Sequence, residues 1–198
     1  MSLVSRLIPL GFIVVGLVLT LCGSFAGFSA TAQSSAAPKG RAAHIVPPVK
    51  ASVAPRAVNT QELLSLLKGD GSRPLLVNYW ATWCDACRDE FPDLVKIDKQ
   101  YRPKGLDFIA ITLDDLKDIN TEVPKFLRKM RATMPVYLLN VVDPEPAINA
   151  VDREWGGALP ATFLYNAKGE IVYKHVGRVN ADELRAAIEK AVAVGTRQ

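Results

Sequence analysis

Two cysteines separated by two residues, Cys84 and Cys87, restrict the fold of this chain more than any other feature. They follow a short apolar run, residues 74–80, which is typical of a buried strand. They precede a charged segment, residues 85–101, in which the apolar residues recur near helical spacing. The sequence therefore predicts a strand that passes directly into a helix, with the cysteine pair at the junction.

Three kinds of chemistry use such a pair: a zinc site, a structural disulfide or a redox centre. Structural zinc needs four ligands, usually from two such pairs, whereas the sequence beyond residue 32 holds only two cysteines and two separated histidines, His44 and His175. A disulfide that closes so short a loop removes little entropy from the unfolded chain, because this stabilisation grows with loop length. We therefore expect no metal and disfavour the purely structural role.

A redox centre has a physical mechanism at this junction. If Cys84 begins the helix, the unpaired N–H groups and the helix dipole favour its thiolate. Cys87 then lies one turn further on the same face, a rise of about 4.5 Å, which is within reach of a disulfide. We expect Cys84, the more exposed thiol, to attack a substrate disulfide, and Cys87 to resolve the mixed disulfide.

The segments that surround this junction predict an α/β domain. Apolar runs indicate further strands, and a turn at Gly169 indicates a hairpin: 106–113, 134–140, 161–166 and 170–177. Helical spacing and capping residues indicate four more helices: 60–69, a helix with Pro124 in its first turn, 148–155 and 180–194. Strands that alternate with helices and end in a hairpin indicate a central mixed β-sheet with helices on both faces.

Polar residues at two helix starts predict how those helices begin. Thr60 is expected to cap the helix that starts the domain. Asn180 is expected to cap the last helix, and Glu183 three residues later completes the pattern of a capping box.

The first 32 residues have the pattern of an export signal or a membrane anchor. Arg6 precedes an uncharged apolar stretch, residues 7–28, that is long enough to span a bilayer. The small residues 30–32 suit cleavage after Ala32, and Cys22 leaves lipid attachment as a third fate. In each case the domain lies outside the cytoplasm, in the bacterial periplasm or at the outer face of the cytoplasmic membrane, where disulfides form.

An Ala-, Pro- and Ser-rich segment follows this leader. Residues 33–58 lack sustained periodicity and are expected to be a tether. Residues 59–198 are expected to form the folded domain. The net charge of +4 is spread along the chain without a stripe of basic residues and stacking aromatics, so we expect no nucleic-acid partner.

The stretch WATWCDACRDEFP resembles the active-site region of the thioredoxin superfamily. It is most similar to the TlpA/ResA-like extracytoplasmic thiol–disulfide oxidoreductases, whose usual form is W-A-x-W-C-x-P-C-x-x-E-x-P. GALPATFLYNAKGEIV is similar to their cis-proline segment and the hairpin after it, so the resemblance covers about residues 60–195. It implies a thioredoxin-like fold and a monomeric enzyme without a cofactor. The implied partners are protein disulfides and a membrane or periplasmic electron donor.

The resemblance also assigns roles to particular residues. Cys84 and Cys87 match the redox-active disulfide, and Glu90 matches a glutamate that tunes the thiols. A tryptophan beside the pair and the cis-proline segment, whose backbone docks the substrate like an added strand, match the remaining positions: Trp83, Leu159, Pro160 and Ala161.

Three positions depart from the patterns of the family. Ala86 stands where these relatives commonly have proline, which removes a fixed φ angle and adds an N–H donor. Asp85 disfavours a neighbouring thiolate but is itself favoured at a helix start, so the sign of its effect on Cys84 stays open. Asn78 stands where cytoplasmic thioredoxins keep a buried aspartate, so we expect the acid role at Glu90.

The sequence therefore predicts an extracytoplasmic thiol–disulfide oxidoreductase that reduces partner proteins, with cytochrome c maturation as one setting. Two alternatives stay open. A disulfide-forming oxidase or isomerase would use the same fold and thiols. A copper-binding assembly protein would use the thiols as soft ligands, with His175 as the candidate histidine of the folded domain.

Overall fold

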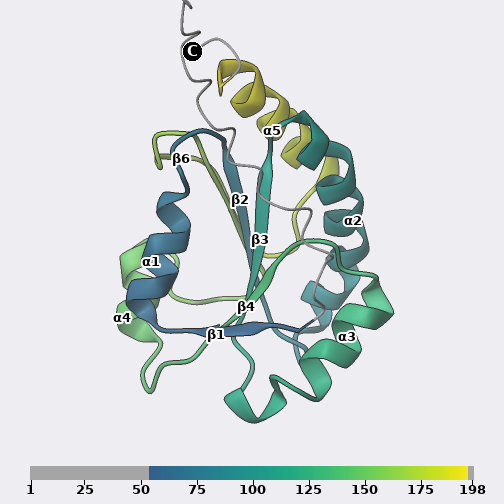
Figure 1. Ribbon diagram of the computed structural model, residues 1–198, viewed down its shortest axis with the longest axis vertical. Helices are drawn as coiled ribbons and strands as arrows, with labels where there is room; N and C mark the ends of the chain where they lie inside the picture. The colour runs from purple at the N-terminus through teal and green to yellow at the C-terminus, as the bar shows by residue number, and fades with distance from the viewer. Residues whose placement is uncertain (1–53, 196–198) are drawn as a thin grey trace, which may run out of the picture. The chain divides into compact units, whose positions relative to one another are not determined.

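The computed structural model describes residues 54–195, which form one six-stranded sheet with helices on both faces (Figure 1). The strands, in chain order, are β1 (Arg56–Val58), β2 (Leu75–Trp80), β3 (Asp107–Thr112), β4 (Val136–Leu139), β5 (Ala161–Tyr165) and β6 (Ile171–Val176). The α helices are α1 (Thr60–Lys68), α2 (Asp85–Tyr101), α3 (Glu122–Met130), α4 (Glu145–Val151) and α5 (Ala181–Gly195). Two 3-10 turns, η1 (Arg102–Lys104) and η2 (Leu116–Asp118), complete the elements.

The sheet is mixed, as the sequence predicts. Its strand order is β1-β4-β3-β2-β5-β6. The first four strands of this order run parallel to one another, whereas β5 and β6 run antiparallel to their neighbours. Strand β2 lies between β3 and β5, and all six of its residues are buried, which explains its continuous apolar run.

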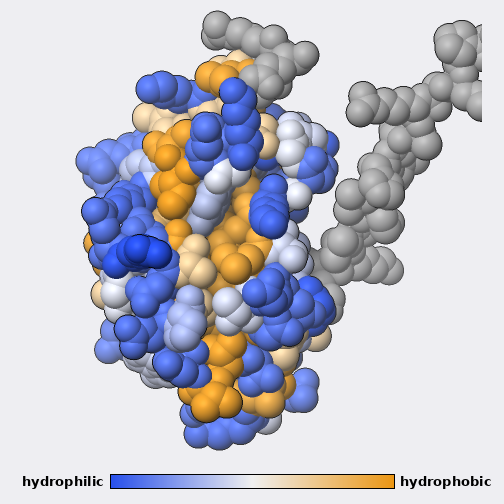
Figure 2. Space-filling model, turned by 90° about the vertical axis from the view of Figure 1, so that its left-hand side faces the viewer, coloured by the Kyte–Doolittle hydropathy of each residue, from blue (hydrophilic) through white to orange (hydrophobic). Residues whose placement is uncertain are grey.

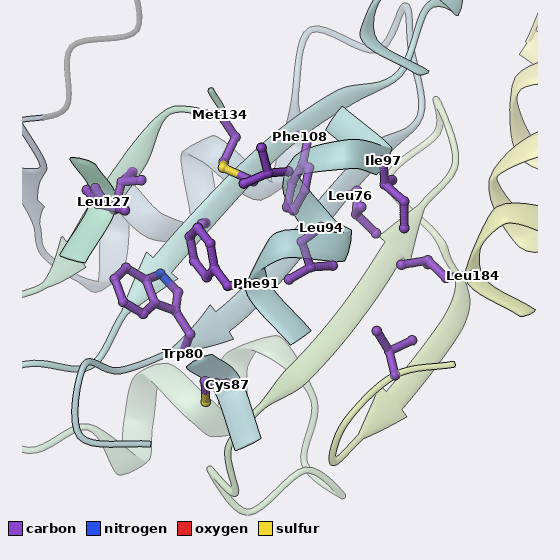
Figure 3. Close-up of a cluster of buried hydrophobic side chains, with 14 of the residues drawn as sticks. Leu76, Trp80, Cys87, Phe91, Leu94, Ile97, Phe108, Leu127, Met134 and Leu184 are labelled. Carbon is purple, nitrogen blue, oxygen red and sulfur yellow. The ribbon is translucent and has the colours of Figure 1, made fainter. Parts of the chain in front are cut away.

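Two apolar clusters cover the two faces of the sheet. Helices α2, α3 and α5 lie on one face, and α1 and α4 lie on the other (Figure 1). The cluster beneath α2, α3 and α5 includes Trp80 and Phe91, whose ring centroids are 5.0 Å apart, and it extends to Cys87 (Figure 3). On the side of α1 and α4, the surface carries a band of hydrophobic residues between hydrophilic ones (Figure 2).

The first strand of the sheet precedes residue 59, at which the sequence predicts the domain to begin. Strand β1 (Arg56–Val58) lies inside the segment that we expected to be a tether, and it pairs in parallel with β4. Three residues are too few to show the alternation of a strand, and their partner is distant in sequence, so no local pattern indicates this pairing. The leader, residues 1–32, and residues 33–53 of the expected tether lie outside the described residues. No helix between residues 54 and 195 is long and apolar enough to cross a membrane.

Two helix starts differ from the prediction. Helix α1 is capped by Asn59 and not by Thr60, because Asn59 and Glu62 exchange two hydrogen bonds of 2.9 and 3.0 Å in a capping box. Helix α4 runs from 145 to 151 instead of 148 to 155. The helix starts earlier because Pro146 is tolerated in the first helical turn, where its missing N–H costs no hydrogen bond. Asn180 begins the last helix as predicted, and its side chain accepts from the N–H of Glu183 at 3.3 Å.

Candidate functional site

Cys84 and Cys87 lie at the start of α2 and are joined by a disulfide. Their Cα atoms are 5.3 Å apart, and the Cys87 N–H donates to the Cys84 Sγ at 3.2 Å. Cys84 is the N-cap residue of the helix, as expected, and 8% of it is exposed, whereas Cys87 is fully buried. The order of exposure that distinguishes an attacking from a resolving thiol is therefore present in the structure.

The tryptophan before the pair faces solvent. Trp83 is 66% exposed, although it lies between the buried residues of β2 and the buried pair. The loop that carries it is closed by a hydrogen bond from the Cys84 N–H to the Ala81 carbonyl at 3.2 Å. The exposed indole is a large apolar surface next to Cys84 in the sequence.

The segment before β5 reaches the same end of the sheet. The Leu159–Pro160 peptide bond is cis, as the resemblance implies. Because β5 is antiparallel to β2 and Ala161 pairs with Tyr79, Pro160 lies beside the end of β2 from which the cysteine loop departs. Leu159 packs against the cluster that contains Cys84. The structure thus brings the cis-proline segment and the disulfide together.

The residues of the cis-proline segment differ in which of their backbone groups are already hydrogen-bonded within the domain. Ala161 is fully buried, and it has a paired strand on each side, β2 and β6. The Pro160 carbonyl accepts from the Gly177 N–H at 2.8 Å, and the Ala158 carbonyl accepts from the Trp155 indole at 2.8 Å. An incoming strand would therefore pair at Leu159 and not at Ala161.

Glu90 lies on α2 one turn beyond Cys87 and is only 2% exposed. Its carboxylate accepts from the Asn78 side-chain amide at 2.9 Å and from the Val179 N–H at 3.0 Å. Burial raises the pKa of the Glu90 carboxyl above its ordinary value, and these two hydrogen bonds oppose that shift only in part. Glu90 is thus a buried carboxyl group on the helix that carries both cysteines.

Three polar residues, Asn78, Thr162 and His175, form a row that starts at Glu90. Asn78 also donates to the Thr162 hydroxyl at 3.1 Å, its cross-strand partner on β5. Thr162 in turn lies opposite His175 on β6, and the positive charge of a protonated His175 favours the Glu90 carboxylate. A row of polar side chains therefore crosses three strands beneath α2.

The raised pKa of Glu90 predicts a pH-dependent contribution to stability. Between the ordinary pKa, near 4.5, and the higher folded-state pKa, the folded chain binds more protons than the unfolded chain, so the free energy of unfolding falls as pH rises through this window. In Glu90→Gln this decline is absent. Denaturant unfolding of the oxidised full-length protein at a series of pH values should therefore show that the variant gains stability relative to wild type as pH rises.

A glutamine side chain fits this site. The Asn78 amide can turn so that its Oδ1, which has no partner among the described residues, accepts from the amide of the substituted side chain. Glu145→Gln, at an exposed position, measures the general effect of removing a carboxylate. A difference between wild type and Glu90→Gln that stays constant with pH, or that changes in the opposite direction, would contradict the assignment.

A mixed sheet that presents a Cys-X-X-Cys disulfide at a helix start, next to a cis-proline before an antiparallel strand, defines the thioredoxin-like class of proteins. The chain belongs to the AhpC/TSA family, whose model matches residues 46–174.

Relatives within this class carry related names. The chain is 31% identical over 109 residues to the thiol-disulfide oxidoreductase ResA of Bacillus subtilis, with 55% of this chain and 54% of that protein covered. It is 32% identical over 120 residues to the thiol:disulfide interchange protein DsbE of Allochromatium vinosum, with 60% and 59% covered. The ResA protein of Bacillus anthracis is 27% identical over 124 residues, with 63% and 65% covered. The chain thus spans between 54 and 65% of the length of these relatives.

A solved structure has the same fold. The thiol:disulfide interchange protein of the thioredoxin family from Chlorobium tepidum TLS is similar with a TM-score of 0.52 and 25% identity, covering 65% of this chain and 83% of that one.

Proposed function

We propose that this protein is an extracytoplasmic thiol–disulfide oxidoreductase that reduces disulfides of partner proteins. One observation carries the proposal: the Cys84–Cys87 disulfide at the N-terminus of α2, in which Cys84 is the more exposed of the two cysteines, near Leu159 and the cis-proline. The names of the relatives support this reaction class.

The proposed reaction has two exchange steps. The thiolate of reduced Cys84 attacks one sulfur of a substrate disulfide, which forms a mixed disulfide and releases the other substrate sulfur as a thiolate. The Cys87 thiolate then attacks the Cys84 sulfur, which closes the intramolecular disulfide and releases the second substrate thiolate. Two electrons pass to the substrate, and a membrane or periplasmic donor later reduces the pair.

The surroundings of the pair support a division of labour between the thiols. At the N-cap, the helix dipole favours the Cys84 thiolate. Once ionised, the Glu90 carboxylate one turn beyond Cys87 disfavours a second thiolate there, so Cys87 stays protonated until the mixed disulfide forms. Substrate chains dock on Trp83 and along Leu159 and Pro160. Apo-cytochrome c in its maturation is one substrate that we propose.

The direction of electron flow is tested by the reduction potential of the Cys84–Cys87 couple. We expect the full-length protein, equilibrated with dithiothreitol or glutathione buffers, to give a potential of about −270 mV, as for a reductant. A potential of about −120 mV would reassign it as a disulfide-forming oxidant. Stoichiometric copper(I) binding that is lost in His175→Ala would instead favour a copper-assembly function.

A further inference from the structure

A second buried carboxylate, that of Asp114, is bonded to the loop that leads to Cys84. Asp114 follows the end of β3 and is 4% exposed. Its carboxylate accepts from the Thr82 N–H at 3.0 and 3.2 Å and from the Thr82 hydroxyl at 2.5 Å. The Thr112 hydroxyl donates to the same carboxylate. One side chain thus holds both polar groups that Thr82 offers.

Asp114 lies where the backbone pairing between β2 and β3 ends. Trp80 and Thr112 are the last paired residues of β2 and β3, and the N–H of Leu113 donates to the Trp80 carbonyl at 2.9 Å. Beyond this point the two strands separate. The carboxylate of Asp114 continues the connection onto Thr82, two residues before Cys84.

Among residues 54–195, the contacts that fix the position of Trp83 are those of its neighbours in the chain. It is 66% exposed, so packing contributes little to its orientation. On one side Thr82 is bound by Asp114, and on the other side Cys84 is fixed by its N–H bond to Ala81 and by the disulfide. Reduction of the disulfide removes one of the two contacts that fix Cys84. The orientation of the loop then depends more on the hydrogen bonds between Asp114 and Thr82.

We propose that Asp114 is a positioning residue that holds the loop of Trp83 and Cys84 in the orientation that receives a protein disulfide. This inference rests on the proposed function. The carboxylate touches neither sulfur nor substrate and acts through Thr82. It therefore governs how a bulky partner docks next to Cys84 more than how reactive the Cys84 thiol is.

The test compares a protein disulfide with a small one. In the full-length reduced protein, we expect Asp114→Ala to lower the second-order rate constant with insulin by about tenfold, because a misplaced docking loop loses oriented encounters. The rate constant with glutathione disulfide, which needs little docking surface, should change by less than about threefold. Asp114→Asn retains an acceptor oxygen for Thr82 and should recover most of the insulin rate.

Two further variants separate the contact with the loop from general stability. Thr112→Val removes one hydrogen bond to the same carboxylate but leaves the loop contact intact, so its insulin rate should stay within about twofold of wild type. Thr82→Val removes the loop hydroxyl while retaining the branched shape. The double variant Thr82→Val/Asp114→Ala should lose no more of the insulin rate than Asp114→Ala alone, since both substitutions disrupt the same contact between residues 82 and 114.

Amide hydrogen exchange of Thr82 provides a readout that does not depend on the proposed function. We expect the exchange of this amide to accelerate in Asp114→Ala and to stay slow in Asp114→Asn. Equal losses with insulin and glutathione disulfide, or unchanged exchange, would overturn the positioning role. If the wild-type protein fails to reduce insulin, the proposed function is refuted. In that case, faster exchange of the Thr82 amide in Asp114→Ala would show only that Asp114 orders the loop. If Asp114→Ala does not fold, Thr82→Val decides by the same two rate constants.

Discussion

Replacement of Cys84 by serine is expected to lower the rate of insulin-disulfide reduction by at least about a thousandfold, to the level of the uncatalysed reaction. The serine hydroxyl stays protonated at neutral pH and cannot form a stable disulfide, so the first exchange step is lost. The fold should persist, because Cys84 is an N-cap residue and serine is a favoured N-cap. Turbidity of insulin with dithiothreitol as electron donor measures the rate.

Two other cysteine variants make this result specific. Cys22→Ser removes a thiol outside the described domain and should leave the rate unchanged. Cys87→Ser retains the attacking thiol but lacks the resolving one, so it should accumulate a mixed disulfide with its substrate that dithiothreitol releases. Substantial insulin reduction by Cys84→Ser, or a mixed disulfide that forms through Cys87 in that variant, would reverse or remove the proposed roles.

Replacement of Phe91 by alanine is expected to lower the free energy of unfolding by about 3–5 kcal/mol, the range for removing a buried phenylalanine. Phe91 is fully buried on the helix that carries both cysteines. Its ring lies 5.0 Å from the ring of Phe126 on α3. The ring of Trp80 on β2, next to it in Figure 3, is also 5.0 Å away. Since small domains are stable by only about 5–15 kcal/mol, this loss is a large fraction of the total.

Denaturant unfolding of the oxidised protein measures this loss. Lys99→Ala, an exposed position of the same helix, is the matched control and should change stability by less than about 0.5 kcal/mol. A loss below about 1 kcal/mol in Phe91→Ala would mean that the aromatic contacts of α2 do not hold it on the sheet.

The sequence predicts most of the elements because their signals are local. The apolar run of β2 and the helical spacing of α2 lie next to each other, so the junction with Cys84 and Cys87 is predicted at its observed boundaries. The cis bond of Pro160 follows from resemblance in a short segment. The errors occur where a local signal is weak or ambiguous: three residues of β1, and the prolines at the start of α4.

The candidate site was predicted only in part, for a related reason. Its cysteines and Glu90 belong to one motif, but the groups that satisfy the carboxylates do not. Glu90 binds the N–H of Val179, which is 89 residues away in sequence, and Asp114 binds Thr82, which is 32 residues away. A hydrogen bond across such separations depends on which strands are neighbours and on their register, and no periodicity along the chain encodes either.

The sequence alone therefore determined the kind of chemistry, since two thiols one helical turn apart at a strand–helix junction have few other uses. Tertiary structure alone decided what surrounds them. By placing β2 between β3 and β5, the sheet turns Asn78 and Glu90 toward each other and brings Asp114 to the cysteine loop. These contacts stabilise the fold because a buried carboxylate without hydrogen-bond donors would cost free energy.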